Sequence, residues 1–206
     1  ASALDSVGSN GVTALIDGSY VVGSSGWDRN NGATPNAGAV TLGSGSSGTS
    51  GVISPANSLV GTTAQDRVGS AALAAQANGN FVIDSPLWDN VATDDAGAIT
   101  LGLSDGSVTG SITSTHSVLG VAATPVVPAV FGYDAVRNQL AVGQAASNRV
   151  VLQRTGIATT ISIVGDAPDP SVGGQPVTFI ATLSATPSAP ANGQVTFTAS
   201  GGESCV

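Results

Sequence analysis

The sequence predicts an all-β protein whose main part consists of propeller-like units of four antiparallel strands. The first observation behind this fold class is an internal repeat, because residues 5–61 match residues 66–120 with a period of about 60 residues. The second is composition, since glycine, serine, threonine, alanine and valine dominate and aromatic residues make up only 4% of the chain. Small and β-branched side chains favour short strands joined by tight turns over long helices.

The repeat is carried by short segments that recur in the same order in both copies. The matching pairs are Val7-Gly8-Ser9 with Val68-Gly69-Ser70, Trp27-Asp28 with Trp88-Asp89, and residues 37–43 with 96–102. A repeat of this kind buries its apolar face mainly against its neighbours. We therefore predict a repeat domain over 1–154, with units at about 5–65 and 66–125 and a degenerate third unit or cap at 126–154. Residues 155–206 are predicted to form a second module.

Each unit is predicted to begin with a β-hairpin. Its strands are residues 11–15 and 19–22 in the first copy, and 74–77 and 80–83 in the second. They flank Asp17-Gly18 and Asn78-Gly79, dipeptides that accept positive φ at a two-residue hairpin turn. Because this signal recurs at one repeat position, we predict a strand over 71–77, although that alanine-rich segment alone resembles a short helix.

The rest of each unit contains a loop with tryptophan and aspartate and two further strands. The third strand is predicted at 38–42 and 97–101, and the fourth at 51–53 and 110–112. Four short antiparallel strands in such a unit describe a propeller blade better than a sandwich. Since two units do not close a propeller of roughly four or more blades, we expect missing sequence or other subunits to extend the array. Apolar–polar alternation predicts strands at 159–164, 177–183 and 193–198.

The repeat resembles those of large bacterial secreted and surface proteins. The residues that carry this resemblance are Tyr20-Val21-Val22, Trp27-Asp28 and the segment 36–40. More distantly, the repeat is similar to the FG-GAP blades of integrin-type propellers. FG-GAP blades often carry a calcium loop of alternating aspartates that closes on glycine, and residues 28–32 and 89–95 hold only fragments of such a loop. The resemblance therefore implies an extracellular or cell-surface location, without implying calcium.

The C-terminal segment resembles a bacterial Ig-like module of surface adhesins, through residues 168–179 and 193–197. An Ig-like sandwich has seven strands in about 100 residues, whereas about 50 residues follow Thr155. We therefore expect an incomplete Ig-like β-sandwich. Either missing sequence completes it, or strands from another copy pair with its open edge.

Charge and cysteine content narrow the classes of partner. The net charge is -8 and all five basic residues are arginine, so nucleic acid and anionic membrane surfaces would be repelled. No apolar run approaches the roughly 20 residues that span a bilayer. Cys205 is the only cysteine, and we expect it to form a disulfide with a partner beyond Val206 or on another chain. A free thiol on the C-terminal tail is the alternative.

Two repeat features invite a binding hypothesis. Trp27-Asp28 and Trp88-Asp89 place an aromatic ring beside a carboxylate, an arrangement that suits stacking against a sugar. The alternative is structural: each tryptophan fills the gap between adjacent units and each aspartate caps a turn. Recurrence in both copies favours the structural interpretation.

The remaining candidate residues indicate neither an enzyme nor a firm cofactor site. Asp89, Asp94 and Asp95 are candidate calcium ligands, but the first copy has Pro35 and Asn36 at this place, which favours solvated turn carboxylates. His116, the only histidine, aligns with Asn57 of the first copy, so we predict a surface turn residue. Catalysis by histidine needs a nucleophile and an orienting carboxylate beside it.

These observations favour a structural or adhesive segment of an extracellular bacterial surface protein or filament. It would act through packing between repeats and through β-edge or Ig-like association. Its expected partners are further repeats or other copies of itself. A carbohydrate-binding module that uses the tryptophan–aspartate loops is the alternative, with glycans as its partners.

Overall fold

The computed structural model describes residues 5–91, 93–122, 130–145, 148–154, 159–167, 178–185, 197–198 and 204–205. These residues contain strands and turns and no α-helix, which confirms the predicted all-β class. The chain divides into two compact units, Ala1–Thr155 and Gly156–Val206. In the described residues, no helix has the length and apolar character needed to cross a membrane.

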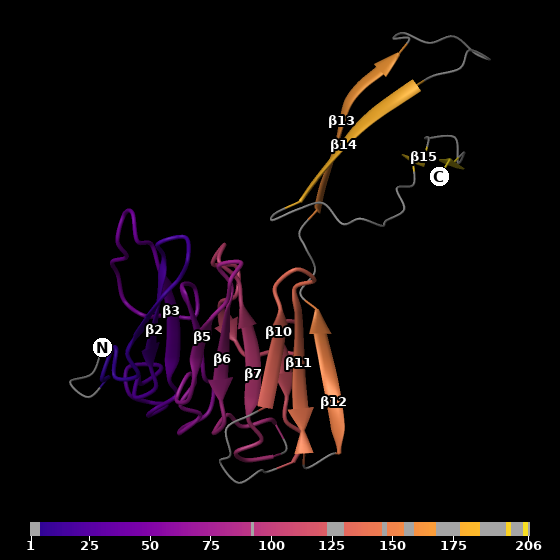
Figure 1. Ribbon diagram of the computed structural model, residues 1–206. Coiled ribbons are helices and arrows are strands. Elements are labelled where there is room, and N and C mark those ends of the chain that lie inside the picture. The colour runs from indigo at the N-terminus through magenta and orange to yellow at the C-terminus, as the bar shows by residue number, and fades with distance from the viewer. Residues whose placement is uncertain are drawn as a thin grey trace. The chain divides into compact units, whose positions relative to one another are not determined.

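The first unit contains three sheets that follow one another in chain order (Figure 1). Sheet 1 consists of β1 (Val12–Ala14), β2 (Tyr20–Ser24), β3 (Ala39–Gly43) and β4 (Ser58–Val60), with one added strand described below. Sheet 2 consists of β5 (Leu73–Ala75), β6 (Phe81–Ser85), β7 (Ala98–Gly102) and β9 (Ser117–Leu119). Sheet 3 consists of β10 (Val130–Asp134), β11 (Gln139–Gln144) and β12 (Arg149–Arg154). Each repeat therefore forms the predicted antiparallel, four-stranded unit.

The hairpin at the start of each repeat is confirmed, but its loop is longer than predicted. The backbone N–H of Leu15 donates to the carbonyl of Ser19 at 2.8 Å, and that of Gly18 donates to the carbonyl of Leu15. Only the glycine has positive φ, at 86° in both Gly18 and Gly79. The connection is therefore a three-residue loop ending in a left-handed glycine, rather than a two-residue turn. In the second repeat β5 forms the first strand, so the alanine-rich segment is not a helix.

The predicted fourth strand is wrong in the first copy, and in the second copy the predicted segment contains a strand that pairs outside its own repeat. Residues 51–53 form no strand, and the fourth strand of each repeat is instead β4 or β9. A pair of hydroxyl groups joins this strand to the third: Thr41 Oγ1 lies 2.7 Å from Ser58 Oγ in a partly buried pair, and Thr100 Oγ1 lies 2.8 Å from Ser117 Oγ in a buried one. Such cross-strand pairs stabilise a short strand that has only three residues.

The segment predicted as the fourth strand of repeat 2 joins the other repeat. Strand β8 (Gly110–Ser111) pairs in parallel with β4, where Gly110 lies opposite Leu59 and Ser111 opposite Val60. Sheet 1 therefore has five strands, the last of which comes from repeat 2. Strand β8 therefore links the two repeats through backbone pairing, in addition to the packing of their side chains.

Apolar layers separate the sheets. Successive strand residues point to opposite faces, so Val40 and Leu59 face sheet 2 while Ala39 and Val60 face the other way. The layer between sheets 1 and 2 consists of Leu15, Val21, Val40, Leu59, Val68, Phe81, Ile83, Trp88, Ala98 and Ile112. The layer between sheets 2 and 3 consists of Val82, Ile99, Leu101, Val118, Leu140 and Val142. Repeat packing thus supplies most of the core.

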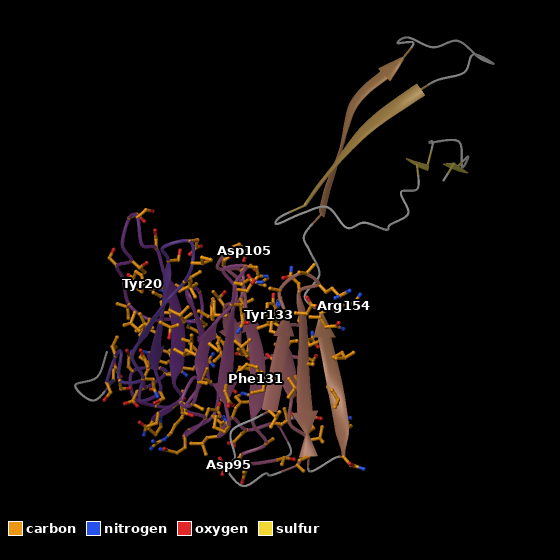
Figure 2. All side chains as sticks on the ribbon, viewed as in Figure 1. Tyr20, Asp95, Asp105, Phe131, Tyr133 and Arg154 are labelled. Carbon is orange, nitrogen blue, oxygen red and sulfur yellow. The ribbon has the colours of Figure 1, made fainter. Side chains whose placement is uncertain are left out.

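Sheet 3 binds the hairpin loop of repeat 2 through a polar network. The Tyr133 hydroxyl donates to Asn138 Oδ1 at 2.7 Å and accepts from Asn78 Nδ2 at 3.0 Å and Asn80 Nδ2 at 2.9 Å. Asn138 and Asn80 are both buried. Figure 2 shows Tyr133 and Phe131 on the same strand of sheet 3.

Replacing Tyr133 by phenylalanine is expected to lower the free energy of unfolding by about 1–3 kcal/mol, because buried amide groups would lose their shared partner. Tyr20→Phe is the matched control, since Tyr20 lies on the half-exposed face of sheet 1. Urea unfolding of both variants measures the difference. An equal effect of the two substitutions would contradict a role for the network.

The second unit contains four short or medium-length strands in its described part. Strand β13 (Thr159–Ala167) pairs antiparallel with β14 (Thr178–Ala185), and β15 (Phe197–Thr198) pairs with β16 (Ser204–Cys205). The predicted strands at 159–164 and 177–183 correspond to β13 and β14. Cys205 lies opposite Phe197 in the β15–β16 pair. The disulfide predicted for Cys205 concerns a side chain outside the described part of the structure.

Candidate functional site

Both tryptophans of the tryptophan–aspartate loops are buried. Trp27 and Trp88 are each 6% exposed. Trp88 belongs to the layer between sheets 1 and 2, while Trp27 packs with Ala39, Val60 and Ile53 on the other face of sheet 1. Stacking against a sugar requires an accessible ring face, and neither indole offers one at this exposure. The geometry favours the structural role for these rings.

The aspartates of the same loops cap backbone groups. Asp28 Oδ1 accepts from the N–H of Asn36 at 2.8 Å, and Asp89 Oδ1 accepts from that of Asp95 at 2.8 Å. These bonds close equivalent loops in the two repeats. A carboxylate in this position satisfies a turn N–H and limits the loop's conformations.

A second aspartate, at the start of each repeat, accepts a hydrogen bond from a backbone N–H group of this loop. Asp5 Oδ1 accepts from the N–H of Asp28 at 3.2 Å, and Asp66 Oδ1 accepts from that of Asp89 at 3.0 Å. Asp66 Oδ2 also accepts from the N–H groups of Thr62 and Thr63, at 2.7 and 2.8 Å. Asp66 thus joins the end of repeat 1 to the loop of repeat 2. The recurrence of aspartate at positions 5 and 66 was the available sequence signal for this role.

The Asp66 carboxyl group is fully buried, and burial raises its pKa despite the three backbone N–H groups that lower it. The neighbouring Asp89 carboxylate also raises this pKa. Because the folded-state pKa lies above the ordinary value of 3.8, the folded protein holds the proton more strongly than the unfolded chain does. The contribution of this group to stability is therefore greatest when Asp66 is protonated.

We expect the free energy of unfolding of the wild type to fall relative to that of Asp66→Asn as the pH rises from 3.8 through the raised pKa of Asp66. Above that pKa the difference between the two proteins is constant, because Asp66 is ionised in both states of the wild type. Urea titrations at a series of pH values measure this difference. If the free energy of unfolding of the wild type instead rose relative to that of Asp66→Asn over the same pH range, the raised pKa would be contradicted.

The calcium candidates do not converge. Asp94 and Asp95 are exposed, and Asp89 Oδ1 is engaged by the Asp95 N–H. Within the described ranges, no three His, Cys, Asp or Glu side chains gather closely enough to hold a metal ion.

His116 lies in the turn before β9, at the position that Asn57 occupies before β4. The turn position is as predicted, but the side chain is half-buried. Its Nδ1 atom is buried with no hydrogen-bond partner among the described residues. Gln153 Nε2 donates to the carbonyl of Thr115, the residue before the histidine, at 2.8 Å. These contacts describe a turn held against sheet 3.

A cavity of ≈ 120 Å³ lies between sheets 1 and 2. Apolar side chains from both repeats line most of it, including Val40, Leu59, Phe81, Ile83 and Val108. Its volume is well below the roughly 300 Å³ of a typical ligand pocket. The cavity is a packing gap of the interlayer core, and sequence reasoning did not anticipate it.

The most distinctive surfaces are the outer faces of the stack. On sheet 3, Val130, Val150 and Leu152 are 77%, 69% and 60% exposed. The strand register places Val130 and Val150 on either side of Gly143, and Leu152 beside Ala141. They therefore form one exposed apolar patch. On sheet 1, the face opposite sheet 2 carries Val12, which is 64% exposed, and the half-buried Tyr20.

The chain contains stacked β-sheets that share layers of side chains, and one repeat adds a strand to the sheet of the other. This arrangement defines a β-repeat protein. Comparison with known families agrees with this class. Residues 14–70 and 75–127 each match a family described as a repeat of unknown function (DUF5650), and together the two matches cover more than half of the chain. The chain therefore belongs to this repeat family. The matches support the predicted repeat but assign neither the FG-GAP nor the Ig-like identity. None of the curated proteins matches the chain.

Proposed function

We propose that this chain is a structural or adhesive segment of an extracellular bacterial surface protein or filament. The observation that supports this proposal is the stack itself, in which the core lies between repeats and both outer sheet faces carry apolar residues. Large exposed apolar patches mark surfaces that associate with other proteins. The expected partners are further repeats and other copies of the chain.

The second unit fits this proposal as a connecting module. Its strands β13 and β14 pair antiparallel over eight residues of register, with one irregularity between Ile163 and Gly165. We propose that this pair belongs to an Ig-like sandwich completed by further strands. Addition of a strand at an open sheet edge is one way in which such modules associate.

Self-association of the full chain tests the proposed function. Sedimentation velocity over a range of concentrations is expected to show larger species as concentration rises. Leu152→Asp should weaken this association, because a charge would enter the exposed apolar patch of sheet 3. Val91→Asp is the matched control, since Val91 is fully exposed in a loop outside that patch. A monomer at every concentration, together with equal behaviour of both variants, would contradict the proposal.

A further inference from the structure

The two repeats have equivalent faces, but among the described residues only that of repeat 2 packs against another sheet. In repeat 2, the face directed toward sheet 1 includes Phe81, Ile83 and Thr100, which are 4%, 1% and 0% exposed. Their counterparts in repeat 1 are Tyr20, Val22 and Thr41, and all three are half-buried. The same strands in the same order thus present a closed interface in one repeat and an open one in the other.

The side-chain cluster on the open face corresponds to half of the layer between sheets 1 and 2. Trp27, Ala39 and Val60, which are already 6%, 0% and 0% exposed, form this cluster together with the half-buried Ile53. Their repeat counterparts are Trp88, Ala98, Leu119 and Ile112, and all four pack in the layer between the sheets. There, sheet 1 supplies the opposite half through Val21, Val40 and Leu59. The cluster around Trp27 is therefore built as one side of an interlayer core.

Repeat 1 also has a segment equivalent to β8, but this segment pairs with no strand among the described residues. Gly110 and Ser111 form β8 and pair with β4 of the other repeat, whereas the equivalent Gly51 and Val52 form no strand. Both glycines have positive φ, 121° at Gly51 and 82° at Gly110. Val52 is 69% exposed, and its carbonyl accepts from Asn57 Nδ2 at 3.0 Å. The segment is thus held in place and is accessible for pairing.

From these two features we infer that the open face of sheet 1, together with residues 51–53, binds a further repeat unit of the same kind. The bound unit presents apolar residues equivalent to Val21, Val40 and Leu59 and a free fourth-strand edge that pairs in parallel with Gly51 and Val52. The interface between sheets 1 and 2 is the template for this contact. The inference rests on the proposed function and specifies the partner of one of its surfaces.

An extended protein tests the inference. A second copy of residues 5–65 is joined in front of residue 5 of the full chain, so that the new junction between Gln65 and Asp5 repeats the natural junction between Gln65 and Asp66. Amide hydrogen exchange is then compared with that of the unextended chain. We expect exchange of the amides at 51–53 to slow by about tenfold or more, because strand pairing protects them. The amides of β8 serve as the internal reference, being paired in both proteins.

Two substitutions separate this contact from general stabilisation. In the extended protein Val22→Asp should abolish the added protection, because it places a charge in the new layer, while Val91→Asp should leave it intact. Unchanged exchange at 51–53 in the extended protein would overturn the inference. That result does not depend on the self-association that tests the proposed function, so the two proposals fail separately.

Discussion

Phe81→Ala is expected to lower the free energy of unfolding by about 3–5 kcal/mol, the usual cost of removing a buried phenylalanine. Phe81 is 4% exposed and lies in the layer between sheets 1 and 2. Its ring also covers Gly102, which lies directly opposite on β7 and has room for it only because it lacks a Cβ. The substitution would remove the ring from both contacts and enlarge the cavity that Phe81 already lines. Urea unfolding followed by tryptophan fluorescence measures the loss.

Tyr20→Ala is the matched control for Phe81→Ala. Tyr20 occupies the same repeat position and its ring covers Gly43, the residue opposite it on β3. Its other side faces no neighbouring sheet among the described residues and remains half-exposed. We therefore expect a loss of only about 1 kcal/mol. Equal losses for the two substitutions would show that repeat packing contributes little beyond the ring–glycine contact.

Gly38→Ala is the second large effect we expect, with a loss of more than about 3 kcal/mol from strain and overpacking. Gly38 has φ of 76°, and it forms a parallel bridge with Val68 at the start of repeat 2. An added Cβ would overlap the backbone N of Val68 and lie 2.9 Å from the Cα of Arg67. Because these are backbone atoms, relief requires the two repeats to move apart. Thermal unfolding of the variant measures the effect.

Gly18→Ala separates backbone strain from this close approach. Gly18 also has positive φ, 86°, but an added Cβ there would meet no atom within 4 Å. Its substitution should therefore cost only the strain of a left-handed residue, about 1–2 kcal/mol. Similar losses at Gly18 and Gly38 would contradict the tight junction between the repeats.

Local signals predicted much of the fold. Asp17-Gly18 and Asn78-Gly79 identified the hairpins because a left-handed glycine is needed there, and the turn outweighed the helical appearance of the alanine-rich segment. The segment predicted at 38–42 was close to β3 (Ala39–Gly43), because it recurs at the same repeat position as 97–101. The internal match of residues 5–61 and 66–120 predicted two equivalent sheets. The turn and strand signals depend on neighbouring residues and the repeat on similarity within the chain, and a single sequence displays both directly.

The parts that were missed depend on contacts between distant residues. Strand β4 has only three residues, and it is held by pairing with β3 and β8 and by the hydroxyl pair with Thr41. Nothing near Gly110 in the sequence indicates that its partner lies in the other repeat, some 50 residues earlier. At the candidate site, the loops were located correctly, but the burial of the tryptophans depends on distant contacts: Trp88 is buried between sheets 1 and 2, and Trp27 is buried within its own repeat. The role of Asp66 was missed although its repeat position was visible.

The pairing of β8 with β4 tests the stacked-repeat account most directly. In an NMR spectrum of the intact chain, we predict cross-strand contacts between Gly110 and Leu59 and between Ser111 and Val60, with the pattern of a parallel pair. Contacts between the Phe81 ring and the Val40 or Leu59 methyl groups should accompany them. Contacts from residues 110–111 to β9 of their own repeat, without any to β4, would contradict the addition of this strand of repeat 2 to the sheet of repeat 1.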